Sequence, residues 1–352
     1  MGLTRLNVEG FRCFERAELE PAPGLNLVSG PNASGKTSLL EAIFMLGRGR
    51  SFRASRREVA VREGSEQARV IGQMADGRTL GLEVRRGGWS ARVAGEPVTQ
   101  LAELAGLLPV QVLDPEIHRL VQEGPGERRR YLDWATFHVK PEFLDVWRRY
   151  QRALKQRNSA LKSGQAGSTL ASWEAALAET GPALDRLRAE TVAELAGPVR
   201  LAGQQLLGAD LSLSYRPGQP DGDDFAGALA AHRDRDRRAG MTQIGPHRAD
   251  LVLTINDHKA RGWVSRGQQK LVAAALVLGQ AARLATFWGD RGILLVDDPA
   301  AELDRDHCAA LLGLVAALPF QIFLTAMEAG ALPGIQAARR FHVEQGRVSQ
   351  VV

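Results

Sequence analysis

The chain has 352 residues, of which 44% are hydrophobic, and it carries a formal charge of +5 with an isoelectric point near 9.5. This length is typical of two or three domains with sizeable cores, and the modest basic charge favours a polyanionic partner only weakly. Cys13 and Cys308 form no metal-binding spacing, which favours a reduced, cytoplasmic setting over a disulfide-bonded, secreted one. Residues 1–20 lack the apolar segment and cleavage site of a signal peptide, so we expect a soluble protein.

The first part of the chain, 1–112, is predicted to be rich in β-structure. The runs 3–11 and 24–30 are apolar and bounded by glycine, which is typical of strands. From 37 to 46 the apolar residues recur with helical spacing, so a helix is expected to follow the second strand. The segment 68–98 consists of short β-prone runs separated by Asp-Gly and Gly-Gly turns, which predicts a meander.

The middle part, 113–240, is rich in Ala, Leu, Arg and Glu and is predicted to be helical. Glycine and proline predict helix breaks and a closing loop, at 162–169, 180–183, 196–199 and 216–224. From 241 onward α/β character returns, with strands expected at 249–255, 292–296 and 321–325 and helices at 265–284 and 306–318. This order predicts one nucleotide-binding domain interrupted in sequence by a helical insertion.

A phosphate-binding loop is predicted by GPNASGKT, from Gly30 to Thr37, because it fits the pattern G-x-x-x-x-G-K-[ST] between a strand and a helix. Its glycines allow successive backbone N–H groups to point at phosphate oxygens at a helix N-terminus. Lys36 is expected to reach the β- and γ-phosphates, and Thr37 to offer its hydroxyl to Mg²⁺. The alternative is a glycine-rich turn that happens to contain a lysine.

A second half-site is predicted at ILLVDDPAAELD, 293–304, where a buried strand ends in two acids. A carboxylate at the end of a strand beside a phosphate loop is where an NTPase holds Mg²⁺, and we assign this role to Asp297. Asp298 is the candidate to orient or deprotonate the attacking water. The alternative is that both aspartates only end the strand in a turn.

The stretch WVSRGQQKLVAAALVL, 263–278, places Ser265 immediately before an apolar helix. The simpler interpretation is that this serine caps the helix. Serine, glycine and glutamine at a helix start also provide a hydroxyl and free N–H groups that suit an anion.

The order of phosphate loop, SRGQQ and LLVDDPAAELD resembles that of ATP-binding-cassette ATPases, and the chain as a whole resembles the RecF family, the bacterial DNA-repair members of the SMC-like branch. The resemblance covers essentially the whole chain and includes the segments 47–53, 115–134, 154–158 and 245–250. It implies an α/β fold: an ABC-type ATPase head with a mixed sheet, flanking helices and a β-rich N-terminal subdomain. The halves of this head would be 1–112 and 241–352, and 113–240 would be an inserted, mostly helical domain without a long coiled coil.

The resemblance also implies roles for individual residues, with ATP and Mg²⁺ as cofactors. The Walker A contacts would come from Gly30, Pro31, Asn32, Ala33, Ser34, Gly35, Lys36, Thr37 and Ser38. Gln111 would be the glutamine-loop residue that senses Mg²⁺ and the γ-phosphate, and it joins Lys36 and Asp298 as a catalytic candidate. Mg²⁺ would be held by Thr37, Asp297 and Gln111. Ser265, Gly267 and Gln268 resemble the signature that closes over the nucleotide of a second subunit, and Ala301 to Asp304 resemble the loop that crosses the dimer interface.

Three positions depart from the usual pattern. Arg266 replaces a signature glycine, Asp298 stands where glutamate is usual, and Thr325 replaces the switch histidine of transporters. The last two departures lead to the hypothesis that hydrolysis is slow and that ATP acts as a timer.

Arginine-rich runs at 48–57, 127–130 and 148–157 are candidates for contacts to nucleic-acid phosphates. The side chains considered are Arg48, Arg50, Arg53, Arg56, Arg57, Arg129 and Arg130. For any single run, a solvated face or internal ion pairs is the simpler interpretation. Aromatic residues are not interleaved as in a single-strand stacking platform, so contacts to duplex backbone are favoured.

The favoured function is an ATP-dependent, DNA-binding homodimer of recombinational repair and replication restart. It would act at gaps or single-strand/double-strand junctions, promote recombinase loading, and have RecR and RecO as partners by resemblance, with no membrane association. The alternatives are an SMC-type structural head, for which the helical insertion is too short to form a long arm, and the ATPase subunit of a transporter.

Overall fold

The computed structural model describes residues 2–163, 167–219, 224–328, 330, 332 and 334–351. Contacts within the chain divide it into two compact units, 1–117 with 285–352, and 118–284. The segment 241–284, expected to belong to the C-terminal half of the ATPase head, is part of the second unit. The functional boundaries proposed from the sequence therefore remain predictions.

One sheet of the first unit is antiparallel, with the order β2-β1-β4-β5-β6-β7. Its strands are β1 (Leu3–Phe11), β2 (Phe14–Leu19), β4 (Gln67–Met74), β5 (Thr79–Arg85), β6 (Gly88–Val93) and β7 (Glu96–Val98). Buried and more exposed residues alternate along β4 and β5, so one face packs on the core. The predicted meander is confirmed.

The other sheet has the order β15-β14-β3-β13-β12-β8 and is parallel except for the β14–β15 pair. Its strands are β3 (Leu25–Ser29), β8 (Val110–Leu113), β12 (Ile293–Val296), β13 (Gln321–Ala326), β14 (Arg339–Glu344) and β15 (Arg347–Val351). Every residue of β12 and β13 is buried, as expected for central strands covered on both faces. Because β13 lies between β3 and β12, the carboxyl ends of these three strands meet at one edge.

Helix α1 (Lys36–Arg48) is almost wholly buried and joins the two sheets in one core. Its Gly47 approaches the next connection so closely that a Cβ atom would lie 2.5 Å from the carbonyl oxygen of Leu108. The other helical segments of this unit are η1 (Arg57–Ala60), α2 (Leu101–Leu107), η3 (Gly289–Arg291), α9 (Pro299–Glu302) and α10 (Arg305–Ala316).

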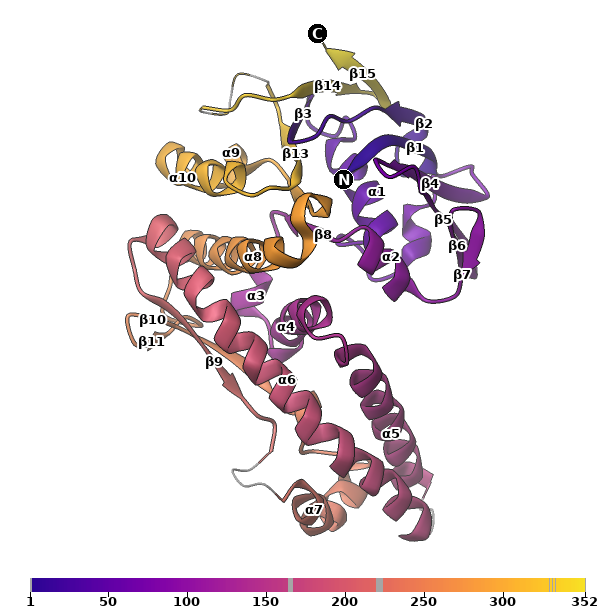
Figure 1. Cartoon of the computed structure of the whole chain (residues 1–352), viewed down its shortest axis with the longest axis vertical. Helices are drawn as coiled ribbons and strands as arrows, with labels where there is room; N and C mark the ends of the chain where they lie inside the picture. The colour runs from indigo at the N-terminus through magenta and orange to yellow at the C-terminus, as the bar shows by residue number, and fades with distance from the viewer. Residues whose placement is uncertain are drawn as a thin grey trace. The chain divides into compact units, whose positions relative to one another are not determined.

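The second unit is mainly helical. It contains α3 (Arg119–Gln122), α4 (Pro125–Val139), α5 (Phe143–Ser163), α6 (Gly167–Leu207), α7 (Phe225–Ala239), η2 (Pro246–Arg248) and most of α8 (Arg266–Trp288). A small sheet with the order β11-β10-β9 is formed by β9 (Leu211–Arg216), β10 (Asp250–Ile255) and β11 (His258–Lys259). Helices α5 and α6 run side by side within this unit (Figure 1).

Helix α6 corrects the sequence analysis, because it is continuous through both predicted breaks at 180–183 and 196–199. It has 41 residues, including Pro182 and Pro198, and is about 60 Å long at 1.5 Å per residue. Packing outweighs the local cost of the prolines: Gly181, for example, admits the ring of Phe225, which would lie 2.5 Å from an added Cβ. Of the other expected irregular stretches, 164–166 and 220–223 lie outside the described residues. Strand β9 was not predicted.

Helix α8 extends through η3 as a segment, Arg266–Arg291, that is long and apolar enough to cross a membrane by length and composition. In its most apolar window, 72% is buried inside the protein. Such burial is typical of a core helix.

Candidate nucleotide-binding site

The loop between β3 and α1 has a backbone that requires glycine. Gly30 has φ 154° and Gly35 has φ 119°, and Ala33 between them has φ 60°. A Cβ on Gly30 would lie 2.1 Å from the carbonyl oxygen of Val343, and one on Gly35 would lie 2.7 Å from Cys13 Sγ. The loop is therefore held against two other segments of the chain, and helix α1 begins immediately after it at Lys36.

Two polar side chains of the loop suit an anion. Lys36 is only 7% exposed, and its Nζ donates to the carbonyl oxygens of Gly30 at 2.7 Å and Pro31 at 2.9 Å. The Ser34 hydroxyl is buried and has no hydrogen-bond partner among the described residues. A buried donor of this kind is costly unless a ligand satisfies it, so the loop has the chemistry of a phosphate cradle.

Asp297 follows β12 and lies beside the start of α1. The Thr37 hydroxyl donates to its carboxylate, at 3.0 Å from Oδ1 and 2.8 Å from Oδ2. The hydroxyl of Thr325, at the end of β13, donates to Oδ1 of Asp297 at 2.8 Å and accepts from the backbone N–H of Asp298 at 2.8 Å. Thr325, which replaces the switch histidine in the resemblance, thus bonds to both Asp297 and Asp298.

Asp298 has a left-handed backbone, with φ 44° and ψ 59°, and stands just before α9. Burial raises the pKa of this carboxyl, and the neighbouring charges of Asp297 and Glu302 act in the same direction, whereas Lys36 lowers it. In the segment Ala301 to Asp304, the carboxylate of Asp304 caps α10 by accepting from the backbone N–H groups of Asp306 and His307.

Gln111 is not brought to the ends of the strands. Parallel pairing places it level with Leu294, and Leu113 level with Val296. Since a strand rises about 3.3 Å per residue, Gln111 lies about 10 Å before the level of Asp297 along the sheet. The residue that follows β8 at this edge is Asp114, which the sequence analysis missed. The sequence pattern that identified Asp297, an acid directly after an apolar strand, also applies to Asp114.

The predicted signature lies in the second unit and is exposed at all four positions from Ser265 to Gln268. Ser265 and Gln268 form a reciprocal cap: the Gln268 N–H donates to the Ser265 hydroxyl at 3.3 Å, and the Ser265 N–H donates to Gln268 Oε1 at 2.9 Å. Behind them, buried Gln269 accepts from Gln122 Nε2 at 2.5 Å and donates to the carbonyl oxygen of Val264 at 3.1 Å. Hydrogen bonds from both sides therefore hold the turn. Of the two roles considered for Ser265, helix cap and anion site, the cap is the simpler one.

Glu41, on α1, was not recognised from the sequence. Its carboxylate is fully buried and accepts from Arg12, with Nε to Oε2 at 2.8 Å and Nη2 to Oε1 at 2.6 Å. It also accepts from Ser51 at 2.5 Å and from Arg53 at 3.4 Å, and Arg53 lies 3.5 Å from the Ser38 hydroxyl. One buried acid thus ties the arginine-rich segment to the helix that carries the phosphate loop. The sequence could have indicated this role, because Glu41 is an acid on the apolar face of a predicted helix.

Several arginines proposed for DNA contacts are used internally. Arg48 donates to the carbonyl oxygen of Val110 at 3.4 Å and lies over the ring of Phe44. Its pKa is lowered mainly by burial and to a lesser extent by the charge of Arg50. Arg57 bonds the carbonyl oxygen of Gly49 and lies over the Trp89 ring. Arg50 and Arg56 are exposed, with 78% of the Arg56 side chain accessible.

The runs in the second unit behave similarly. Arg129 donates to the carbonyl oxygen of Ala249 at 2.7 Å, and Arg130 pairs with Glu127. Arg157 is fully buried and pairs with Asp236 at 2.6 Å and Glu174 at 3.0 Å, which ties α5 to α7 and α6.

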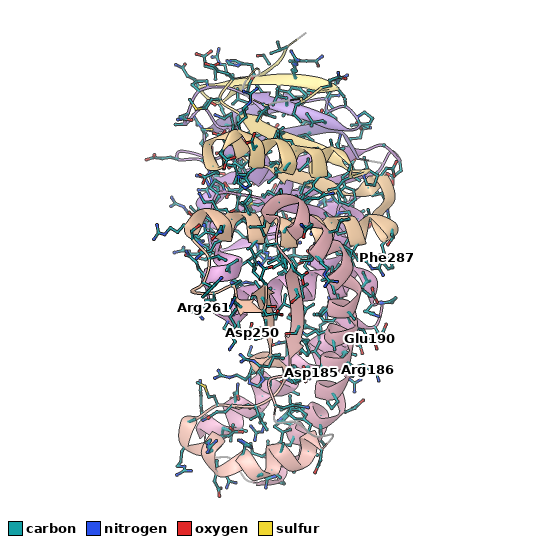
Figure 2. The ribbon with its side chains drawn as sticks, turned by 90° about the vertical axis from the view of Figure 1, so that its left-hand side faces the viewer. Asp185, Arg186, Glu190, Asp250, Arg261 and Phe287 are labelled. Carbon is teal, nitrogen blue, oxygen red and sulfur yellow. The ribbon has the colours of Figure 1, made fainter. Side chains whose placement is uncertain are left out.

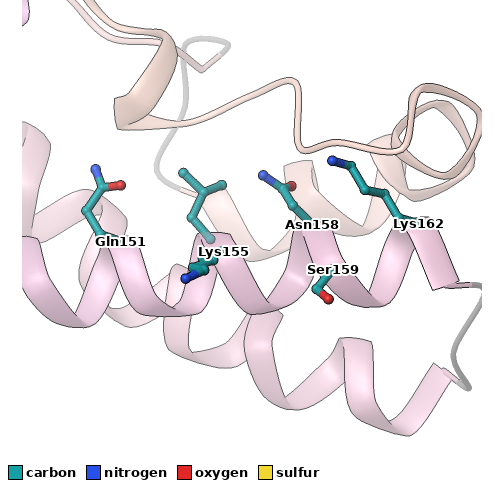
Figure 3. A pocket seen from close by; sticks show the side chains of 6 residues that line it. Gln151, Lys155, Asn158, Ser159 and Lys162 are labelled. Atoms are coloured by element: carbon teal, nitrogen blue, oxygen red, sulfur yellow. The ribbon is translucent and has the colours of Figure 1, made fainter. Parts of the chain in front are cut away.

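A groove of about 480 Å³ remains on α5, where Gln151, Asn158 and Lys162 point to the same side of the helix (Figure 3). Leu154, Lys155 and Ser159 complete its lining. Lys155 and Lys162 have no ion-pair partner in the part of the chain that the structure describes, so this groove is basic. Lys155 belongs to the predicted run 148–157, and Lys162 lies beyond it.

Comparison with known proteins extends over the whole chain. The family model described as RecF/RecN/SMC N terminal domain matches residues 2–350. The DNA replication and repair protein RecF of Stenotrophomonas maltophilia is 40% identical over 368 residues, covering 100% of both chains, and that of Thioalkalivibrio sulfidiphilus is 40% identical with 98% of each covered.

Solved structures give the same result. The recombination mediator protein RecF with ATP, of the RecFOR pathway, matches 100% of this chain and 98% of its own, with a TM-score of 0.90 and 27% identity. The Smc head domain of Pyrococcus furiosus matches with a TM-score of 0.61 at 16% identity, which reflects a shared fold. The expected ATPase-head fold is confirmed.

Proposed function

This chain belongs to the RecF branch of the RecF/RecN/SMC family, and from that membership we propose that it is an ATP-dependent DNA-binding protein of recombinational repair and replication restart. It acts in the cytoplasm at single-strand/double-strand junctions of gapped DNA and promotes recombinase loading. By the same resemblance, RecR and RecO are its partners. The observation that carries the proposal is the contact between Thr37 and Asp297, two residues 260 positions apart that meet beside the phosphate loop.

The loop residues fit a nucleoside triphosphate. The Ser34 hydroxyl is buried without a partner among the described residues, and the Lys36 ammonium is held by carbonyl oxygens that a phosphate would replace. Backbone N–H groups at the start of α1 supply further donors. Lys36 would bind the β- and γ-phosphates, and the glycines would let the backbone approach them.

The donor set also fits Mg²⁺, which prefers oxygen and retains water or phosphate ligands. Thr37 and Asp297 would hold it. Across the described ranges no cluster of three or more His, Cys, Asp or Glu side chains is arranged for a metal, in keeping with a cation completed by the nucleotide. Mg²⁺ bound there would neutralise charge on the triphosphate. Asp114, rather than Gln111, is at the correct edge of the sheet to assist.

We propose slow hydrolysis as a switch. Asp298 stands where a water-orienting residue is required, and Thr325 holds its backbone N–H. Its carboxylate is one methylene shorter than the usual glutamate, which places it farther from the attacking water. The rate of ATP turnover is then a timer for dimer dissociation.

The exposed turn at Ser265, held by a reciprocal cap, supports the proposal that two copies dimerise. In the proposed homodimer, Ser265, Gly267 and Gln268 of one copy close over the nucleotide held by Lys36 of the other. Neither copy alone completes a site.

The test mixes inactive Lys36→Ala and Ser265→Arg chains. Each heterodimer then contains one intact site, so ATPase activity and ATP-dependent sedimentation as a dimer should partly recover. A mixture of Lys36→Ala with the doubly substituted chain is the matched control, because it contains no intact site. Ser265→Ala controls for the lost helix cap, worth about 1 kcal/mol. Equal inactivity of both mixtures would contradict the composite site.

DNA coupling is tested by sedimentation of the unsubstituted chain with gapped duplex, with and without ATP. We expect ATP to increase both the dimer and its DNA-bound fraction. A chain that stays monomeric and unbound in the presence of ATP would exclude the proposed function.

A further inference from the structure

Trp263 is the most exposed of the large hydrophobic side chains in the described part of the protein, at 63%. It lies two residues before Ser265, in the connection between β11 and α8. Single exposed apolar residues are common on protein surfaces, but tryptophan is enriched among the residues that contribute most to binding.

The indole is held in place by His258. The two rings stack with their centroids 4.1 Å apart and an interplanar angle of 17°. On either side of Trp263, Ala260 and Val264 are buried, and the N–H groups of Trp263 and Val264 donate to the carbonyl oxygen of Ala260. The turn therefore fixes the indole before any ligand arrives, which lowers the entropy cost of binding.

Basic residues flank this pair in the sequence. Lys259, Arg261 and Arg266 are all exposed, and none has an ion-pair partner among the residues that the structure describes. Arg261 lies at the left-hand edge of the view in Figure 2. The acid within the same stretch is Asp257, so 257–266 carries an excess of positive charge.

We propose that the His258–Trp263 pair is a stacking platform for an unpaired base of single-stranded DNA, with Lys259 and Arg261 binding the flanking phosphates. A flat aromatic ring among separated cations matches the chemistry by which proteins bind single strands without reading their sequence. A single indole is far smaller than the surface that a stable protein partner needs.

The platform adds to the expected contacts with duplex backbone. Residues 258–266 interleave two aromatic side chains with three basic ones, a local pattern that was not recognised from the sequence. This inference rests on the proposed function, because it takes DNA as the partner. It adds a physical reason why the protein would recognise single-strand/double-strand junctions. A paired base is stacked within the duplex and is not offered to the indole, whereas the single-stranded side of a gap offers bases directly.

The test measures binding by fluorescence anisotropy without ATP. The probes are a fluorescein-labelled oligothymidylate and an abasic oligomer with the same number of phosphates. Trp263→Ala should raise the Kd for oligothymidylate about 5- to 150-fold, the range that base–aromatic stacking accounts for, and leave the abasic oligomer unchanged. Trp263→Phe should retain most of the affinity. Arg261→Ala should weaken both probes and reduce the salt dependence of binding. Leu201→Ala, which removes an apolar side chain that is 61% exposed in the same unit, should change neither.

Three outcomes would overturn the inference: no binding of oligothymidylate by the unsubstituted chain, no effect of Trp263→Ala, or an equal loss for the abasic oligomer. Loss of ATP-dependent dimerisation in Trp263→Ala, with oligothymidylate binding retained, would instead assign the indole to the contact between two copies and would also overturn it. Failure of the proposed function is read separately, from dimerisation and duplex binding of the unsubstituted chain with ATP.

Discussion

Thr325 offers a sharp test of how the site is assembled. Replacing it with valine removes one hydroxyl while keeping the side-chain shape, and that hydroxyl makes two hydrogen bonds. It donates to the carboxylate of Asp297 and accepts from the N–H of Asp298, both at 2.8 Å, and Thr325 is completely buried. We expect Thr325→Val to lower both stability and ATP hydrolysis.

The magnitude follows from the two bonds. A hydrogen bond to a charged group contributes about 1.5–3 kcal/mol and a neutral one about 0.5–1.5 kcal/mol, so the loss should be about 2–4.5 kcal/mol in the free energy of unfolding. Hydrolysis should fall through kcat rather than KM, because the loop contacts that bind the phosphates do not involve Thr325.

The assay compares urea unfolding and steady-state ATPase of Thr325→Val with those of Thr325→Ser, which keeps the hydroxyl and should recover most of both. Thr191→Val is the matched control: Thr191 is also buried, but among the described residues its hydroxyl bonds only to the carbonyl oxygen of Leu187 in its own helix. If Thr325→Val and Thr325→Ser were equally stable and equally active, the hydroxyl would not position the aspartates and the reasoning would be refuted.

Two further predictions concern the loop and the second unit. Gly35→Ala should weaken ATP binding and cost about 1–3 kcal/mol of stability, because φ is 119° at Gly35 and the new Cβ would lie 2.7 Å from Cys13 Sγ. Adding Cys13→Ala should relieve the contact with the sulfur but not the strained backbone. Full recovery of ATP affinity and of stability in urea would contradict the role of backbone strain. Burial lowers the pKa of His247 from its ordinary 6.5 to about 4. As the pH falls, the unfolded chain therefore binds a proton at this histidine before the folded chain does. The stability present above pH 6.5 is lost between pH 6.5 and about pH 4. The loss should reach about 2 kcal/mol near pH 5, and urea titrations of His247→Gln should show a shallower pH dependence than the unsubstituted chain; identical pH profiles would exclude His247 as the cause.

Local features of the site could be predicted from the sequence. The phosphate loop depends on backbone conformations that glycine adopts within a few residues, and the two φ values above 100° in the loop, at Gly30 and Gly35, occur where the pattern requires them. The buried strands β12 and β13 were evident because their residues are apolar without alternation. The cap at Ser265 follows from a four-residue motif.

Other features depended on distant residues. Gln111 belongs to the correct strand, but only the pairing register shows that it stops about 10 Å short of Asp297. Helix α6 continues through two prolines because its buried face packs on α5 and α7, a contribution that local propensity does not include.

The sequence by itself determined the order of the motifs, the loop that suits phosphate, the strand that ends in Asp297 and the family to which they belong, since each of these is encoded within a short stretch. Only the tertiary structure decided which distant side chains meet: Thr325 with Asp297 and Asp298, Glu41 with Arg12 and Arg53, and Arg157 with Asp236 and Glu174, whereas Arg56 stays exposed. A run of charges looks the same whether or not an acid from another element packs against it, and that choice is made by the folding of distant segments into one core.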